Sequence, residues 1–371
     1  MADPPGSTPI SAPGAVRAPH SPLPDRPSAR NVFPVLPAHF SNRAPLVDTH
    51  GRTVRDLRIS VTDRCNLRCV YCMPAEGMPW LQRSDLLTYE ELTRLARVCI
   101  ECGVTGVRLT GGEPTVREDL PALVRMLNDI APDLDLSLTT NALKLPQLAR
   151  ELRDAGLRRV NISLDTLSRE RFHQLARRDR LSDVLAGLDA AKAAGFSPIK
   201  VNAVLMRGVN DDEAVPLARW ARDEGYELRF IEWMPLDFGH TWDRSKLVSA
   251  DEILAAIGAE FTLELEPGAD PSAPATLYRY ADGAGRVGVI ASVTRPFCGR
   301  CDRIRLTADG QIRTCLFAHD EYDLRGLMRG GASDDALEQR LREAVLRKKP
   351  GHLINQPGFI QPARGMSAIG G

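Results

Sequence analysis

Residues 57–72 of this 371-residue chain read LRISVTDRCNLRCVYC and join a predicted strand directly to a group of cysteines. Apolar and polar side chains alternate from residue 57 to residue 61, which is typical of a β-strand. The cysteines that follow, Cys65, Cys69 and Cys72, have the spacing C-x3-C-x2-C. In folds with parallel strands and helices, chemistry lies at the carboxyl ends of the strands. The stretch therefore predicts an α/β fold with thiolate chemistry at the end of its first strand.

Strands and helices alternate along the next 170 or so residues. We predict strands at 57–61, 107–110, 134–139, 159–163, 199–204 and 227–232, and helices at 88–102, 118–130, 146–155, 182–194 and 212–224. Six units with short connections indicate a parallel sheet, but they fall short of the eight that close a standard barrel. We expect an incomplete (βα)6 TIM-type barrel, with a doubly wound sheet as the alternative.

The chain divides into three parts by composition and pattern. Residues 1–45 hold 11 of the 27 prolines, which predicts a disordered Pro/Ala-rich extension. Residues 46–236 form the predicted barrel, and residues 237–371 a C-terminal region with short strands at 276–280, 287–291 and 304–307 and a helix at 334–348. The last three residues, 369–371, are typical of a flexible tail.

Composition limits the class of protein. Lys+Arg and Asp+Glu both number 48, so bulk charge does not favour binding to nucleic acid. No run of 18 apolar residues suggests a membrane span, and the N-terminus lacks the apolar segment of a secretory signal. These features predict a cytoplasmic protein, in which the eight cysteines are more plausibly metal ligands than disulfides.

A second group of cysteines, Cys298, Cys301 and Cys315, has the spacing C-x2-C-x13-C. A set of three thiolates suits a [4Fe–4S] cluster with one iron open to a small molecule. At the second group zinc is the alternative, with His319 as a fourth ligand. Cys99 and Cys102 are also three apart, but they lie on one face of a predicted helix and are expected to be packing residues.

Tyr71 completes the pattern C-x3-C-x-Φ-C, and Gly111-Gly112-Glu113-Pro114 follows the second predicted strand. With the second triplet and the terminal Gly370-Gly371, these motifs make residues 55–371 resemble the GTP 3′,8-cyclase family of radical S-adenosylmethionine enzymes. The resemblance implies a partial barrel closed by the C-terminal region and a [4Fe–4S] cluster at each cysteine triplet. It also implies a lyase that makes (8S)-3′,8-cyclo-7,8-dihydroguanosine 5′-triphosphate from GTP, the first step of molybdenum cofactor biosynthesis.

The resemblance assigns roles to individual residues. The first cluster binds S-adenosylmethionine, whose 5′-deoxyadenosyl radical takes the ribose 3′ hydrogen, and the second binds GTP through its open iron. Contacts to S-adenosylmethionine are implied for Tyr71, Gly112, Glu113, Ser163 and Met234. Contacts to GTP are implied for Arg58, Arg108, Thr139, Lys200, Arg303, Ile304 and Arg305. The tail Gly370-Gly371 is expected to reach the active site, and no general acid or base is implied.

One position departs from the family, because Ala142 stands where relatives often have glycine after Thr139-Thr140-Asn141. If the backbone there has a positive φ, alanine costs roughly 1 kcal/mol.

The implied partners are GTP, an external one-electron donor and the next pathway enzyme, cyclic pyranopterin monophosphate synthase, with the chain as a monomer or homodimer. Two other hypotheses are a radical enzyme of another type with an auxiliary cluster, such as a peptide-maturing one, and a zinc-dependent binding protein without chemistry.

Overall fold

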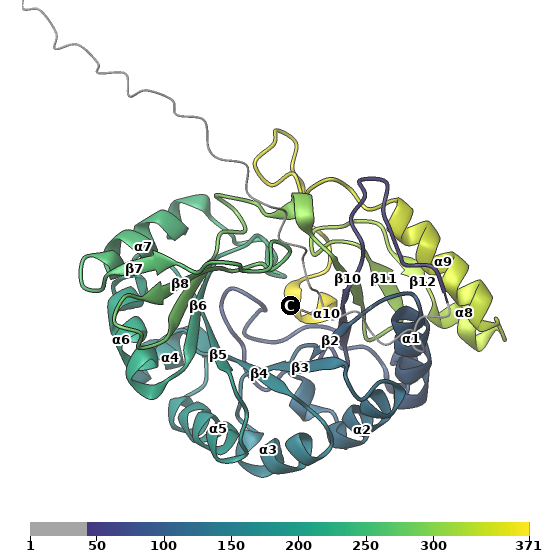
Figure 1. The fold of residues 1–371 in the computed structure, drawn as a ribbon, viewed down its shortest axis with the longest axis horizontal. Helices are drawn as coiled ribbons and strands as arrows, with labels where there is room; N and C mark the ends of the chain where they lie inside the picture. The colour runs from purple at the N-terminus through teal and green to yellow at the C-terminus, as the bar shows by residue number, and fades with distance from the viewer. Residues whose placement is uncertain (1–42, 371) are drawn as a thin grey trace, which may run out of the picture. The chain divides into compact units, whose positions relative to one another are not determined.

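Six parallel strands lie side by side in chain order in the computed structural model, which describes residues 43–370. They are β1 (Asp56–Ser60), β2 (Gly106–Thr110), β3 (Asp135–Thr140), β4 (Arg159–Ser163), β5 (Ile199–Leu205) and β6 (Glu227–Glu232). The sheet curves into an open ring, and the helices that connect its strands cover the outer face (Figure 1). The predicted incomplete barrel is thus confirmed.

The connecting helices begin and end close to the predicted positions. They are α1 (Tyr89–Glu101), α2 (Leu120–Ile130), α3 (Leu145–Asp154), α5 (Leu181–Ala193) and α6 (Ala214–Glu224). Thr88 and Glu91 form the capping box that fixes the start of α1. A further short helix, α4 (Arg169–Ala176), was not predicted; it buries only three side chains, so its apolar pattern is weak.

The C-terminal region extends the sheet at both edges. β10 (Arg303–Leu306) pairs in parallel with β1, and β9 (Arg286–Ile290) pairs in parallel with β6. Antiparallel strands β11 (Gln311–Arg313) and β12 (Tyr322–Asp323) follow beyond β10, and β8 (Thr276–Tyr280) and β7 (Leu263–Leu265) beyond β9. Strands from before and after residue 237 therefore share one sheet, and the C-terminal region closes the open side of the ring as expected (Figure 1).

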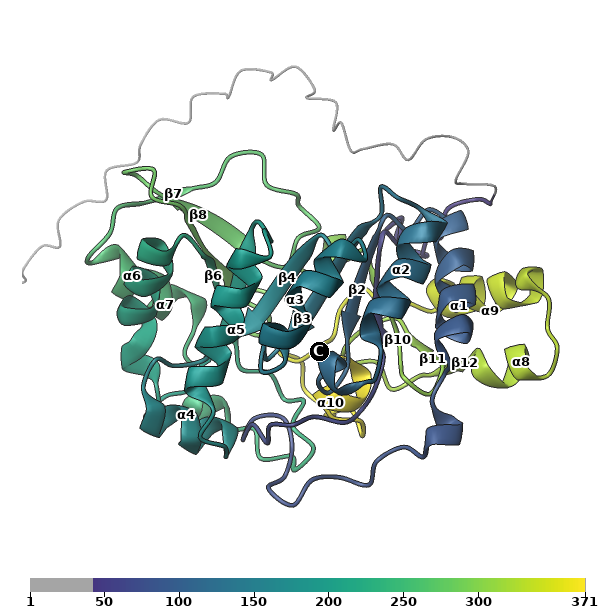
Figure 2. The same cartoon turned by 90° about the horizontal axis from the view of Figure 1, so that it is seen from below.

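The remaining helices are α7 (Ala250–Gly258), α8 (Arg325–Arg329), α9 (Asp334–Leu346) and α10 (Met366–Ile369). Both views place α10 inside the ring of strands (Figures 1 and 2). Ile369 and Gly370 are buried there, so the interpretation of residues 369–371 as a flexible tail was wrong for these two residues. Gly371 lies outside the described residues, as does the predicted extension at residues 1–45 apart from its last three positions.

Two further expectations can be compared with the structure. Cys99 and Cys102 are buried in the main hydrophobic core, as packing residues are. None of the helices within residues 43–370 combines the length and the apolar character needed to cross a bilayer.

Candidate active site

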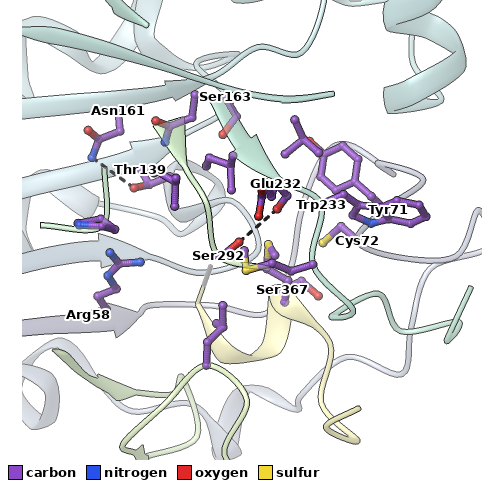
Figure 3. Close-up of a pocket in the computed structure, with 18 of the residues that line it drawn as sticks. Arg58, Tyr71, Cys72, Thr139, Asn161, Ser163, Glu232, Trp233, Ser292 and Ser367 are labelled. Carbon is purple, nitrogen blue, oxygen red and sulfur yellow. Dashed lines mark hydrogen bonds between the residues drawn. The ribbon is translucent and has the colours of Figure 1, made fainter. Parts of the chain in front are cut away.

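A cavity of about 300 Å³ lies inside the ring, and all six cysteines of the two triplets line it. The first triad is Cys65, Cys69 and Cys72; the second triad is Cys298, Cys301 and Cys315. None of the six is in a disulfide. Arg58 lies at one end of the close-up view and Tyr71 and Cys72 at the other, with Thr139, Asn161 and Ser163 along the wall between them (Figure 3).

The loop that carries the first triad is held by two glycines at the end of β2. The Gly112 N–H donates to the Thr62 carbonyl oxygen at 2.8 Å, and the Glu113 N–H donates to the Arg64 carbonyl oxygen at 2.8 Å. A side chain on Gly112 would overlap the carbonyl oxygens of residues 63 and 64, and Gly111 has a φ of +155°. The close backbone approach that these glycines allow is therefore made to the loop before Cys65.

Glu113 is buried at the same place and joins several strand ends. Its carboxylate accepts from the Thr115 hydroxyl at 2.5 Å, the Thr140 hydroxyl at 2.6 Å and the Asn141 N–H at 2.7 Å. Burial raises the pKa of Glu113, while these hydrogen bonds act in the opposite direction. Most of its acceptor capacity is thus used inside the protein, although Glu113 also lines the cavity.

Tyr71 is fixed by a buried carboxylate. Its hydroxyl donates to Asp165 at 2.6 Å, and the Val204 N–H donates to the other oxygen of Asp165 at 2.8 Å. Burial raises the pKa of Asp165 to about 6. The aromatic ring of Tyr71 therefore has a set position on the cavity wall, which Ser163 and Met234 also line.

Arginines occupy neighbouring positions on three strands. Arg305 on β10 pairs with Arg58 on β1, and Arg58 pairs in turn with Arg108 on β2. Like charges opposite each other on a sheet are normally destabilising. Burial and the nearby Arg108 lower the pKa of Arg58 to about 9, and the Arg58 Nε atom has no hydrogen-bond partner among the described residues. Such a group is arranged to receive a polyanion.

The carboxylate Asp56 pairs with Arg303 across the same strands. Although burial would raise the pKa of Asp56, the surrounding arginines hold it below its usual value. Arg303 lines the cavity as well, together with Thr139. Asp302 lies 3.6 Å from Arg303 as well, so two carboxylates stand among four arginines and this part of the wall keeps an excess of positive charge.

Two of the residues implied as GTP contacts do not line the cavity. Ile304 alternates with Arg303 and Arg305, so its side chain points to the other face of β10 and packs in the core. Lys200 lies on β5 before Asn202, which does line the cavity, and its ammonium is 3.8 Å from Glu227.

Sequence reasoning missed several lining residues, among them Arg229, Asn161 and Trp233. Arg229 had a signal, because it lies inside predicted strand 227–232, where a buried charge needs a reason. In the structure its guanidinium contacts Glu227 at 2.6 Å.

The second triad is contributed by the C-terminal region. Cys298 begins a short 3₁₀ turn (Cys298–Arg300), Cys301 follows it, and Cys315 comes after β11. Burial raises the pKa of Cys298 and of Cys315. Cys301 differs, since Arg303 and Lys348 outweigh burial and lower its pKa. At each triad, three unpaired thiols at the wall of one cavity are a donor set that fits a [4Fe–4S] cluster with an open iron.

The zinc alternative finds no support in the position of His319. Its Nε2 atom contacts the Ile360 carbonyl oxygen at 3.1 Å on the exposed surface, and it does not line the main cavity. Within residues 43–370 no three His, Cys, Asp or Glu side chains are arranged around a single metal ion.

The end of the chain enters this site. Met366 and Ser367 of α10 line the cavity, and Arg305 donates a hydrogen bond to the Gly370 carbonyl oxygen. A side chain on Gly370 would lie 2.5 Å from the Thr110 hydroxyl, and the φ of Gly370 is +82°. Position 370 therefore requires glycine.

A partial barrel with a C-x3-C-x2-C loop after β1 and glycines after β2 defines a radical S-adenosylmethionine enzyme. The sequence model of the radical SAM superfamily matches residues 59–221, and the model described as Molybdenum Cofactor Synthesis C matches residues 226–354. The GTP 3′,8-cyclase of Mycobacterium sp. (strain KMS) is 55% identical over 335 residues, covering 90% of this chain and 96% of the relative. The chain belongs to the GTP 3′,8-cyclase family.

Further similarities agree with this. The GTP 3′,8-cyclase of Mycolicibacterium smegmatis is 53% identical, covering 88% of this chain and 92% of the relative. Among solved structures, Streptococcus suis SuiB bound to S-adenosylmethionine has a TM-score of 0.55 at 15% identity, covering 85% of this chain and 77% of SuiB. This last similarity concerns the fold alone.

Proposed function

We propose that this chain converts GTP to (8S)-3′,8-cyclo-7,8-dihydroguanosine 5′-triphosphate as an S-adenosylmethionine-dependent lyase of molybdenum cofactor biosynthesis. The observation that carries the proposal is the single cavity that both triads line, with the arginine group on its wall. Residues 46–236 supply the radical core, and residues 237–371 supply the second triad and the tail.

The first triad holds one [4Fe–4S] cluster and the second triad holds the other. When bound, the first cluster and S-adenosylmethionine supply the 5′-deoxyadenosyl radical that takes the ribose 3′ hydrogen. Tyr71, Gly112, Glu113, Ser163 and Met234 hold S-adenosylmethionine on their side of the cavity. Because the cavity lies inside the ring of strands and α10 contributes to its wall, these residues also shield the reacting atoms from water.

GTP lies toward the second triad, with its phosphates at the arginine group. Arg58, Arg108, Arg303 and Arg305 offer charge-assisted hydrogen bonds to a polyanion that compensates their own repulsion. Thr139 contacts the same ligand, and Ile304 contributes through its backbone. Lys200 acts on the phosphates through its charge, from the part of β5 that precedes the cavity. Gly370 closes this end, since Arg305 already holds its carbonyl.

We also infer the electron donor and the protein partners of this enzyme. Its final step takes up an electron, so an external one-electron donor serves the enzyme in the cytoplasm. The product passes to cyclic pyranopterin monophosphate synthase, and the chain acts as a monomer or homodimer without nucleic acid or membrane.

The test compares two triple variants, each with one triad changed to alanine, after anaerobic reconstitution. The wild-type chain should hold about eight irons, two four-iron clusters, and each variant about four. The variant lacking Cys65, Cys69 and Cys72 should form no deoxyadenosine. The variant lacking Cys298, Cys301 and Cys315 should cleave S-adenosylmethionine without cyclising GTP. Deoxyadenosine from the first variant, or cyclised GTP from the second, would contradict the proposal.

A further inference from the structure

Residues 348–352, between α9 and the C-terminal segment, pass directly over the second triad, and we call them the strap. Arg52 holds the strap to the cysteine turn, because its guanidinium donates to the carbonyl oxygens of Cys298 at 2.8 Å, Lys349 at 2.7 Å and Pro350 at 3.2 Å. Arg52 is itself fixed by Asp48, at 2.6 Å. The strap is therefore tied to the first cysteine of the turn.

The strap also packs against the cysteine side chains. A Cβ atom on Gly351 would lie 3.5 Å from the Cys298 Cβ and 3.8 Å from its sulfur. The backbone N–H of His352 donates to the same cysteine. On the strap, these contacts involve only backbone atoms and a glycine, and Lys348 is the buried strap side chain that contacts the triad.

Lys348 is only 3% exposed. Its ammonium donates to the Cys301 carbonyl oxygen at 2.8 Å and to the Arg303 carbonyl oxygen at 2.7 Å. The third contact is the Cys301 sulfur, 3.7 Å away, which is within hydrogen-bonding range for sulfur. An ammonium has three donors, and these three acceptors use all of them.

A buried ammonium needs a negative partner, since carbonyl oxygens satisfy its hydrogen bonds but not its charge. Within residues 43–370, none of the ion pairs involves Lys348 with a carboxylate. Among the described residues, the group that Lys348 contacts and that can carry the negative charge is the Cys301 thiolate, and with it the cluster that the triad binds. The position of Lys348 is thus explained by the metal centre.

We propose that Lys348 is a positioning residue of the second cluster: its ammonium donates to the Cys301 sulfur, helps to keep the cluster bound and makes the second cluster easier to reduce than the first. This inference rests on the proposed function, which places a cluster at the second triad. A positive charge beside a cluster stabilises its reduced form, which is one unit more negative. Hydrogen bonds to cluster sulfurs are a recognised control of reduction potential.

The experiment uses the reconstituted holoenzyme and three variants. Lys348→Met removes the charge and keeps most of the volume, and Lys348→Arg keeps the charge. Lys349→Met is the matched control, because Lys349 is the next residue but is exposed. The readouts are iron and sulfide content and a reductive titration followed by electron paramagnetic resonance, with the first cluster as internal reference.

Lys348→Met should shift the reduction equilibrium of the second cluster at least tenfold toward the oxidised form, which is about 59 mV for one electron. The reduction potential of the first cluster should be unchanged in every variant. In Lys348→Arg and Lys349→Met the reduction equilibrium of the second cluster should stay within about threefold of wild type, roughly half that shift in potential. Loss of the second cluster from Lys348→Met but not from Lys348→Arg would also support the proposal, because arginine keeps the positive charge and the N–H donors that methionine lacks.

Three results would overturn it. The first is a Lys348→Met variant that has wild-type iron content and in which the reduction potential of the second cluster is unchanged. The second is equal loss of the second cluster from the Met and Arg variants, with the fold intact by circular dichroism. This would mean that the site needs the shape of the lysine side chain and not its charge. The third is a wild-type chain with a single cluster, which the iron analysis detects beforehand and which would overturn the proposed function as well.

Discussion

Both triads line one cavity, but carboxylates are the more numerous charges near the first triad and cations near the second. Burial and the nearby Glu113 raise the pKa of Cys65 to about 12. Burial and the nearby Asp237 raise the pKa of Cys72 to about 11. At the second triad, Arg303 and Lys348 outweigh burial and lower the pKa of Cys301. The same donor set is thus placed in two opposite fields.

The two triads are also held in different ways. The first is positioned by close backbone packing, because Gly111 and Gly112 press against the loop that leads to Cys65, and Arg68 from the loop itself donates to the Cys65 carbonyl oxygen at 2.7 Å. The second is positioned by charged side chains, with Arg52 and Lys348 donating to backbone oxygens of its turn. We therefore expect the first site to be sensitive to added volume, and the second to lost charge.

The largest effect is expected when a side chain is added beside the first triad. In Gly112→Ala the new methyl group overlaps two backbone carbonyl oxygens, so the loop before Cys65 must move. We expect the loss of about four irons, one cluster, and of deoxyadenosine formation. Iron analysis and chromatography of the nucleoside measure both.

Gly299→Ala is the matched control, since Gly299 lies between the cysteines of the second triad and a methyl group there meets nothing within 4 Å. It should keep both clusters. Equal iron loss in the two variants would remove the distinction between a site sensitive to volume and one that is not.

A smaller effect is expected at the arginine group beside the second triad. Arg58→Met removes a charge-assisted contact worth about 1.5–3 kcal/mol, so GTP affinity should fall roughly 10- to 100-fold. Loss of the 3.8 Å ion pair with buried Asp56 opposes the relief of repulsion from Arg108, so the stability of the GTP-free chain should change little. Equilibrium binding and anaerobic urea unfolding test the two parts.

Arg150→Met serves as control, because Arg150 is exposed on α3 and should change neither quantity. An Arg58→Met variant that binds GTP normally would mean that the group serves another anion.

Much of this site could be predicted from the sequence because local patterns carry it. Alternation placed β1 to β6, and Thr88 with Glu91 marked the start of α1. What the sequence could not reveal are contacts between distant residues. Lys348 is 47 positions from Cys301, and Gly112 is paired with a loop 50 positions earlier. Lys200 has the same inward orientation in the alternation of β5 as Asn202, which lines the cavity. It nevertheless lies too early in the strand to line the cavity, and the sequence does not show how far the cavity extends along the strands.

Lys200 gives a pH-dependent prediction. Burial, with the nearby Arg229, lowers its pKa from 10.5 to about 7. The folded chain then binds fewer protons than the unfolded chain between these values, so stability should rise with pH there by up to about 1.4 kcal/mol per unit. Lys200→Met should flatten this rise in urea unfolding from pH 7 to 9, whereas Lys192→Met, on the exposed side of α5, should not. Parallel curves for wild type and Lys200→Met would mean that folding does not lower the pKa of Lys200.

The smallest effect concerns Ala142, in the loop that supports the first triad. The neighbouring Asn141 donates to Asn66 at 2.7 Å, beside Cys65. Ala142 has a φ of +66°, the left-handed conformation that the family's glycine adopts without strain. A Cβ atom on Gly187 of α5 would lie 2.8 Å from the Ala142 methyl group, so the helix accommodates this methyl group only by having glycine there.

Ala142→Gly should relieve about 1–2 kcal/mol of left-handed strain. It should lose about 0.8 kcal/mol for the buried methyl group and about 0.4–1 kcal/mol through the freer unfolded chain. These changes nearly cancel, so the informative quantity is the difference from a matched variant. Ala155 is equally buried but right-handed, with a φ of −72°, so Ala155→Gly bears both losses without relief. Ala142→Gly should therefore be at least about 1 kcal/mol more stable than Ala155→Gly in urea unfolding, with both clusters retained. Equal destabilisation of the two variants would mean that the loop beside the first triad carries no strain at Ala142.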